Sequence, residues 1–258
     1  MSIANYKEHR SAFSALLEKD CDKPILLFKG ESGTGKSTLL EHCRTQIHQD
    51  IYSVSVDLRN TSNVMQIFSQ MGRRLTWDCF DNFKQQLGEL NRQFNINVNG
   101  NTQAGVGNMI NVELKALFDN TTPEQRTEHY TALTNAWAED INALNKPCVL
   151  LLDVYEDANS EIKRWINGDF LSCASDSRQM RVVIAGKSVP ESFEWNHCCE
   201  LKQLYGVHDA KEWLSVIKSK KKIIPAQNPM DFLAGICHAL NGNPSAIARV
   251  IDGFPSIQ

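Results

Sequence analysis

A glycine-rich stretch near the N-terminus constrains the fold of this chain more than any other feature. Gly30, Gly33 and Gly35 are spaced so that the backbone can turn into a concave nest with its N–H groups pointing inward. An apolar run over residues 24–28 precedes the stretch, and a helical pattern begins near Lys36. A strand, a nest and a helix N-terminus in this order predict a phosphate-binding loop.

The side chains of this loop also predict a nucleotide. Lys36 supplies a mobile positive charge for the β- and γ-phosphates, and the hydroxyl of Ser37 is a ligand suited to Mg²⁺. We therefore expect the chain to bind ATP or ADP together with Mg²⁺. The predicted loop comprises Gly30, Glu31, Ser32, Gly33, Thr34, Gly35, Lys36, Ser37 and Thr38.

Length and charge limit the remaining possibilities. A chain of 258 residues can hold one large α/β domain, or such a domain with a small appendage. The formal net charge of −3 gives no general attraction to nucleic acid or to an anionic membrane. The N-terminus lacks the apolar segment of a signal peptide. We therefore expect a cytoplasmic protein without membrane contact, in which the eight cysteines are reduced.

Hydrophobic periodicity predicts alternating helices and strands along most of the chain. The strands at 147–153 and 181–187 are almost wholly apolar, as central strands covered on both faces are. A capping box at Thr122 to Gln125 marks the start of the longest helix. The expected helices cover residues 4–19, 36–47, 62–94 (two helices), 122–146 and 160–166, and the expected strands cover 23–29, 51–58, 147–153, 181–187 and 199–204.

The segment from 95 to 112 contains no charged residue, but six asparagines and three glycines. Two apolar pairs flank it, Ile96 with Val98 and Ile110 with Val112, and each pair alternates as residues of a strand do. The pattern predicts a hairpin or a mobile insert at about 95–121. It is either a partner-binding or gating loop or a solvated insertion without a role, and we favour the second.

Charged residues follow two of the predicted buried strands. Asp153 can bind the water shell of Mg²⁺ beside Ser37, or it can cap the helix that follows. Glu156 can polarise an attacking water, or it can be, with Asp157, a first-turn acid that the helix dipole stabilises. Lys187 can bind the γ-phosphate, or it can be an ordinary surface lysine. These residues complete the predicted site.

Composition changes near residue 205. From 206 to 258 the pattern predicts a small helical bundle, in which Gly242 stops one helix and Pro244 starts the next. The lysine-rich run at 218–222 can touch a phosphate backbone, although such runs are usually only solvated. We therefore divide the chain into a nucleotide-binding domain at 1–205 and a helical domain at 206–258.

The order of these motifs resembles that of the STAND class of P-loop ATPases. This class comprises signal-transduction relatives of AAA+ proteins and includes bacterial counterparts of NLR immune receptors. A helix carrying Tyr6 and Arg10 precedes the first strand, as in the class. The matching motifs are GESGTGKST at 30–38, VDL at 56–58, LLLDVYED at 150–157, RVVIAGK at 181–187, ELKQL at 200–204 and GNP at 242–244.

The resemblance implies an α/β fold: a five-stranded parallel sheet flanked by helices, with the phosphate-loop strand beside the strand that ends at Lys187. It also implies that residues 206–258 form a lid over the nucleotide. In that arrangement Gly242 and Pro244 face the adenine, and Tyr6 and Arg10 contact the nucleotide. Without the resemblance, the Gly-Asn-Pro corner is only a helix stop and restart.

The chain departs from the class in three respects. Val154 stands where many hydrolysing relatives have a second acid, and Lys187 stands where arginine is common. The sequence ends at Gln258, where a winged-helix domain usually follows, so we expect a fragment or a minimal version. Self-association, or binding of a partner protein, is then expected to involve the insert or the missing C-terminal region.

The predicted function is an ATP/ADP-binding switch module of a signalling or defence ATPase with slow, Mg-dependent hydrolysis. Its predicted catalytic residues are Glu156, Asp153 and Lys36, and its metal ligands are Ser37 and Asp153. One alternative is a P-loop small-molecule kinase, which needs an arginine-rich lid, whereas 206–258 contains only Arg249. Another is an AAA+-like ATPase acting on DNA, which needs a basic surface; a nucleic-acid partner is therefore disfavoured.

Overall fold

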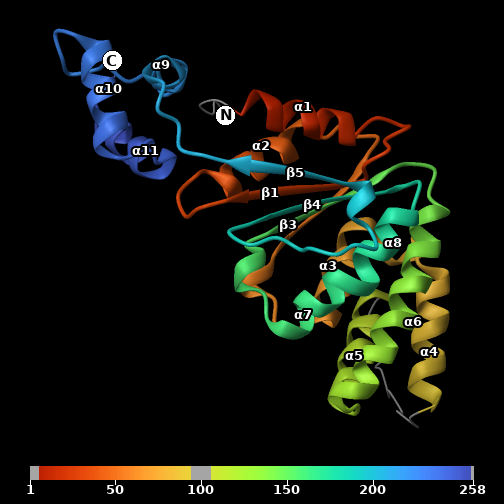
Figure 1. Ribbon diagram of the computed structural model, residues 1–258. Helices are drawn as coiled ribbons and strands as arrows, with labels where there is room; N and C mark the ends of the chain where they lie inside the picture. The colour runs from red at the N-terminus through yellow and green to blue at the C-terminus, as the bar shows by residue number, and fades with distance from the viewer. Residues whose placement is uncertain (1–5, 94–105, 257–258) are drawn as a thin grey trace.

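The computed structural model describes residues 6–93 and 106–256 and arranges them as one parallel β-sheet with helices on both faces (Figure 1). The strands pair in the order β2-β3-β4-β1-β5, and every pair is parallel. The expected five-stranded parallel sheet is confirmed. The strands are β1 (Ile25–Gly30), β2 (Tyr52–Asp57), β3 (Cys148–Asp153), β4 (Met180–Gly186) and β5 (Cys199–Leu204).

The strand order determines which loops meet. β4 lies between β3 and β1, so the carboxyl ends of these three strands are neighbours at one edge of the sheet. In open parallel sheets, ligands bind just beyond the carboxyl ends of the strands. The phosphate loop follows β1, Asp153 ends β3 and Lys187 follows β4, so the fold brings the predicted site residues to one place.

Helices cover both faces of the sheet (Figure 1). Alternate residues of β1 separate two hydrophobic clusters, since Ile25 and Leu27 join one and Leu26 and Phe28 join the other. No helix among the described residues is long and apolar enough to cross a membrane. The helices are α1 (Lys7–Leu16), α2 (Lys36–Gln46), α3 (Val64–Leu75), α4 (Asp81–Gln93), α5 (Val106–Asp119), α6 (Pro123–Asn142), α7 (Ser160–Trp165), α8 (Leu171–Asp176), α9 (Ala210–Ser219), α10 (Pro229–Ala239) and α11 (Pro244–Asp252).

The first cluster lies on the side of α3 to α8, and the second lies on the side of α1, α2 and α9 to α11. The C-terminal helices gather past the carboxyl end of β5, where the chain leaves the sheet (Figure 1). The predicted capping box forms at the start of α6, where the Gln125 N–H donates to Thr122 Oγ1 and the Thr122 N–H donates to Gln125 Oε1. A helix that begins at a proline and a capping box needs no tertiary contact to define its start.

The strand-like prediction for the insert at 95–121 is wrong in its second half. Helix α5 covers Val106–Asp119, so Ile110 and Val112 lie on a helix and not on a hairpin strand. Ile110 and, further along, Leu114 and Leu117 are buried against α3 and α4. Their spacing of four and three residues is the helical period, which outweighs one alternating pair. Ile96 and Val98 lie outside the described residues.

Candidate nucleotide-binding site

The loop between β1 and α2 has the geometry of a phosphate nest. Gly33 and Gly35 have φ angles of 80° and 88°, in the left-handed region that other residues rarely adopt. A Cβ atom on Gly30 would lie 2.7 Å from Thr34 Oγ1, so this position also requires glycine. Gly35 is the N-cap of α2, and no side chain caps that helix. The first N–H groups of α2 are therefore available to an anion.

Lys36 is buried at the base of the nest, with 8% of its surface exposed. Its Nζ donates to the carbonyl oxygens of Gly30 at 2.8 Å and Glu31 at 3.0 Å. Burial lowers the pKa of Lys36, and the nearby carboxylates of Glu156 and Asp153 oppose that shift. The ammonium group is thus held close to the loop and to two acids that the sequence places more than a hundred residues away.

Ser37 and Asp153 meet across the edge of the sheet. The Ser37 hydroxyl hydrogen-bonds the Asp153 carboxylate, and the N–H of Val154 donates to Asp153 Oδ1 at 2.9 Å. Burial raises the pKa of Asp153; these two hydrogen bonds oppose the shift, while the charges of Asp57 and Glu156 add to it. A hydroxyl and a carboxylate, completed by phosphate oxygens and water, are the ligands that Mg²⁺ takes at nucleotide sites.

The residues present therefore fit Mg²⁺ held together with a nucleotide better than a metal held by protein alone. The described part of the chain contains no group of three or more His, Cys, Asp or Glu side chains arranged to hold a metal ion. Asp57 ends β2 directly beside Asp153 in the strand register, and it was missed in the sequence analysis. The VDL motif placed it at a strand end, which is the signal that could have identified it.

The chain turns sharply after Asp153. Val154 has a φ angle of 59°, an uncommon and strained conformation for a β-branched residue. The turn brings Glu156 to the end of β4, where its Oε2 accepts a hydrogen bond from the Lys187 N–H at 2.9 Å. Asp157 instead pairs with Arg59, with Oδ2 3.1 Å from Nε. The structure therefore separates the two acids: Glu156 lies at the site, and Asp157 forms an ion pair beside it.

Lys187 lies at the mouth of the phosphate loop. Its Nζ is 4.0 Å from Glu31 Oε2, and both side chains are largely exposed. The positive charge of Lys187 also contributes to lowering the pKa of Lys36, so the two cations are near enough to repel each other. Binding of the γ-phosphate by Lys187 stays a prediction.

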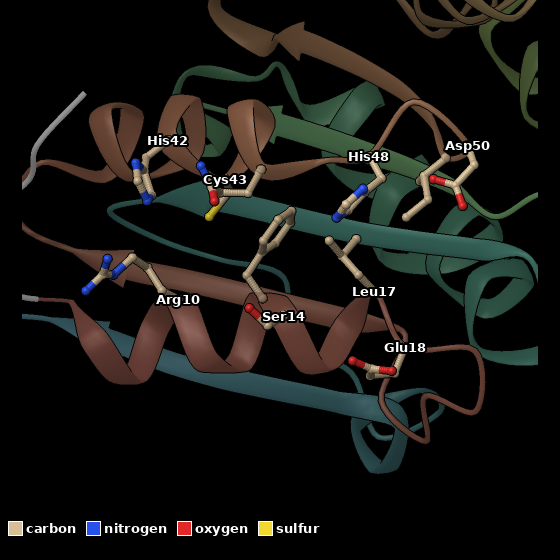
Figure 2. Close-up of a pocket in the computed structure, with 11 residues that line it drawn as sticks. Arg10, Ser14, Leu17, Glu18, His42, Cys43, His48 and Asp50 are labelled. Atoms are coloured by element: carbon tan, nitrogen blue, oxygen red, sulfur yellow. The ribbon is translucent and has the colours of Figure 1, made fainter.

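Tyr6 and Arg10, both expected at the nucleotide, face different parts of the protein. The buried Tyr6 hydroxyl donates a hydrogen bond to the carbonyl oxygen of Thr34, within the loop. Arg10 faces His42 across a groove of about 470 Å³ between α1 and α2 (Figure 2). The structure thus brings Tyr6 to the phosphate loop and places Arg10 at the groove between α1 and α2, so a nucleotide contact of Arg10 stays a prediction.

The Gly-Asn-Pro corner between α10 and α11 lies directly on the phosphate loop. Asn243 Nδ2 donates to the carbonyl oxygen of Ser32 at 3.3 Å, and the Ser245 N–H donates to that of Gly33 at 3.0 Å. Pro244 lies 3.8 Å from the position of a Cβ on Gly35. Asn243 and Ser245 were not singled out in the sequence analysis, because nothing local to residues 242–245 shows which surface they contact.

Comparison with known proteins identifies the fold. No family model and no curated protein matches this chain. The Walker-type ATPase PABY2304 of Pyrococcus abyssi matches with a TM-score of 0.52 and 11% identity, over 97% of this chain and 67% of that one. PCH-2 of C. elegans matches with a TM-score of 0.43 and 14% identity, over 96% and 62%. Cdc6p of Pyrobaculum aerophilum matches with a TM-score of 0.41 and 12% identity, over 100% and 65%.

This chain therefore has the fold of the P-loop ATPases, as its sheet order and the first of these matches show. It spans about two thirds of the length of these three proteins.

Proposed function

We propose that this chain binds ATP and ADP with Mg²⁺ and hydrolyses ATP slowly. One observation carries the proposal: the nest, the buried Lys36 and the hydrogen-bonded pair of Ser37 and Asp153 meet at one edge of the sheet. A nest alone accepts any anion. A lysine and a hydroxyl–carboxylate pair beside it supply the separate contacts that a metal-bound polyphosphate needs.

Each residue then has a distinct task. The N–H groups of the loop hold the phosphates, and Lys36 can exchange its two carbonyl partners for phosphate oxygens. Ser37 and Asp153 would hold Mg²⁺, which supplies charge neutralisation and orientation of the phosphates. We assign to Glu156 the role of accepting a proton from an attacking water; one of its oxygens accepts from the Lys187 N–H, and the other has no donor among the described residues, which supports this assignment.

Slow hydrolysis follows from the environment of Glu156. The hydrogen bond from the Lys187 N–H occupies one carboxylate oxygen of Glu156, so only the other oxygen is left to accept a proton from water. The neighbouring Val154 adds no second acid. We propose that the chain accordingly works as a switch of the STAND type, in which the identity of the bound nucleotide is the signal, and not as a high-turnover ATPase. Self-association or a partner protein is a prediction of the same proposal.

An ATPase acting on DNA is the second candidate, and the structure supplies a way to test it. Two of the four lysines in the run at 218–222 are engaged within the C-terminal helices, as Lys220 pairs with Asp252 and Lys222 Nζ donates to the carbonyl of Phe254. Lys218 and Lys221 remain for a phosphate backbone. Filter binding with duplex DNA at two salt concentrations tests this candidate, because genuine phosphate contacts give a steep salt dependence.

The proposal is tested by calorimetric titration of the chain with Mg-ATP and ADP. Lys36→Ala should abolish measurable Mg-ATP binding without unfolding the protein, because no neighbouring cation can replace Lys36 inside the nest. The matched control is Lys29→Ala, which removes a half-buried lysine near the end of β1 whose Nζ lies 3.7 Å from Glu191 Oε1. Unchanged affinity in the Lys36 variant, or equal losses in both variants, would contradict the proposal.

A further inference from the structure

Five consecutive carbonyl groups of the phosphate loop, Gly30 to Thr34, accept hydrogen bonds from donors in three separate parts of the chain. Lys36 holds the first two carbonyls from within the loop's own helix. The next two are held from the corner that begins α11, and the last from the residue that precedes α1. The donor and acceptor pairs are Lys36 Nζ to Gly30 and Glu31, Asn243 Nδ2 to Ser32, the Ser245 N–H to Gly33, and the Tyr6 hydroxyl to Thr34.

These hydrogen bonds to the carbonyl oxygens also orient the N–H groups of the loop, because each peptide bond is planar. In a trans peptide the C=O of one residue and the N–H of the next lie in one plane and point in opposite directions. The described residues contain no cis peptide bond. A donor on the Ser32 carbonyl therefore fixes the direction of the Gly33 N–H, and a donor on the Thr34 carbonyl fixes that of the Gly35 N–H.

Gly33 and Gly35 are the loop residues that most need such fixing. Both have positive φ angles and no side chain, so their peptide planes are the least restricted in the loop. The approach of Asn243 is itself possible only at glycine, because a Cβ on Gly33 would lie 2.6 Å from the Asn243 amide. The amide orientation is set by the Ala246 N–H, which donates to Asn243 Oδ1 at 3.1 Å and leaves Nδ2 for the loop.

We propose that Asn243 and Tyr6 are positioning residues that aim the N–H groups of Gly33 and Gly35 at the phosphates. The inference rests on the proposed function, because it requires a phosphate ligand in the nest. It differs from a contact between the corner and the adenine, since it acts on the phosphate loop whether or not a base is present. The affinity for phosphate would then depend on whether the C-terminal helices and the N-terminal helix are docked on the loop.

Inorganic tripolyphosphate with Mg²⁺ distinguishes positioning of the loop N–H groups from a contact with the adenine, because it can bind in the nest but has no base. The variants are Asn243→Ser, which retains a good helix cap but cannot reach Ser32, and Tyr6→Phe, which loses only the hydroxyl. The control is Asn228→Ser, the same change at the start of α10, where the side chain makes no capping hydrogen bond. Affinities for tripolyphosphate and ADP are measured by calorimetry on the full chain.

We expect Asn243→Ser and Tyr6→Phe each to weaken tripolyphosphate and ADP by the same factor, roughly two- to tenfold for one lost neutral hydrogen bond. The control should bind as the parent does. A loss confined to ADP would overturn the inference in favour of a base contact, and unchanged tripolyphosphate affinity in both variants would overturn it outright.

A ligand-free measurement keeps this result distinct from a failure of the proposed function. A parent protein that binds neither ligand refutes the nucleotide proposal. The carbonyl ¹³C resonance of Ser32 should nevertheless shift in Asn243→Ser and stay in place in Asn228→Ser, since only the first change removes its donor. If neither substitution changes the Ser32 resonance, the hydrogen bond from Asn243 to the Ser32 carbonyl does not form.

Discussion

Asp153, a predicted metal ligand, lowers the stability of the empty protein. Its carboxylate is partly buried beside Asp57 and Glu156, and both burial and these charges raise its pKa above the ordinary value for aspartate. Ser37 and Val154 return only part of the lost hydration through hydrogen bonds. A metal ion would remove the repulsion, so the residue is better suited to the loaded protein than to the empty one.

This pKa shift gives a pH-dependent prediction. Between the unfolded and the higher folded pKa of Asp153, the folded state binds more protons than the unfolded state, so the contribution of Asp153 to stability is lost as pH rises through that window. Asp153→Asn should therefore raise the melting temperature of the ligand-free protein at neutral pH, and less so at a pH below the window.

The same variant should lose Mg-dependent ATP turnover more than ADP binding, because it removes charge next to the metal and leaves the nest intact. Asp157→Asn is the control, since that acid pairs with Arg59 outside the site. Two results would count against Asp153 as a metal ligand. One is an Asp153→Asn variant that melts at a lower temperature than the parent at neutral pH, and the other is a loss of ADP binding as large as the loss of turnover.

Glu156 and Asp157 are adjacent in sequence and provide a second test at this scale. Glu156→Gln should lower the rate of ATP hydrolysis by about 10²–10⁴-fold, the usual effect of removing a general base, with little change in Mg-ATP affinity. Asp157→Asn should change the rate far less, because its carboxylate is committed to Arg59. Single-turnover hydrolysis measures both. If the Glu156 variant hydrolyses ATP as fast as the parent, another group activates the water.

Helix α5 is the element that departs most from the sequence pattern, and its packing can be measured. Leu114 is buried between α5 and the helices α3 and α4, whereas Val112 on the same helix is 49% exposed. Leu114→Ala should lower the free energy of unfolding by about 2–5 kcal/mol, and Val112→Ala by much less. Urea denaturation of the two variants tests this, and equal, small effects would show that α5 contributes little to the core.

The corner between α10 and α11 is the element on which the proposed switch depends. Pro244→Ala removes a ring that fixes the backbone at the start of α11 and lies near Gly35. The substitution should reduce the rise in melting temperature that ADP produces. In the parent, a ligand at a hundred times its Kd adds about 2.7 kcal/mol to the free energy of unfolding. The melting temperature without ADP should stay nearly unchanged.

Paired melts of the parent and the Pro244 variant, with and without ADP, decide the matter. An ADP-induced shift of equal size in the two proteins would make the corner a structural joint between helices and remove its proposed part in nucleotide binding.

At the scale of the whole molecule, the site is assembled from segments far apart in the chain. β1, β3 and β4 bring their carboxyl ends together because the strand order makes them neighbours. α1 and α11 pack with α2 into one hydrophobic cluster on the same face of the sheet, and this places both beside the phosphate loop. The proposed nucleotide site and the docked C-terminal helices therefore share one hydrophobic core.

The sequence by itself determined the features that depend on near neighbours. The nest at Gly33 and Gly35, the capping box before α6 and the buried strands β3 and β4 all follow from residue types at short spacing, where local sterics and burial decide the conformation. The resemblance to known P-loop proteins added that the phosphate-loop strand β1 lies beside β4. The positions of Asp153 and Lys187 at strand ends followed from the same patterns.

Only the tertiary structure decided which distant groups complete the site. The tie from Asn243 to Ser32 spans 211 residues, and no local pattern in either segment specifies it. Tertiary packing also placed Arg10 in the groove beside α2, Asp57 beside Asp153, and α5 in the core. The physical reason is that local propensity is set by a few adjacent residues, whereas the direction in which a side chain finds its partner depends on how whole elements pack.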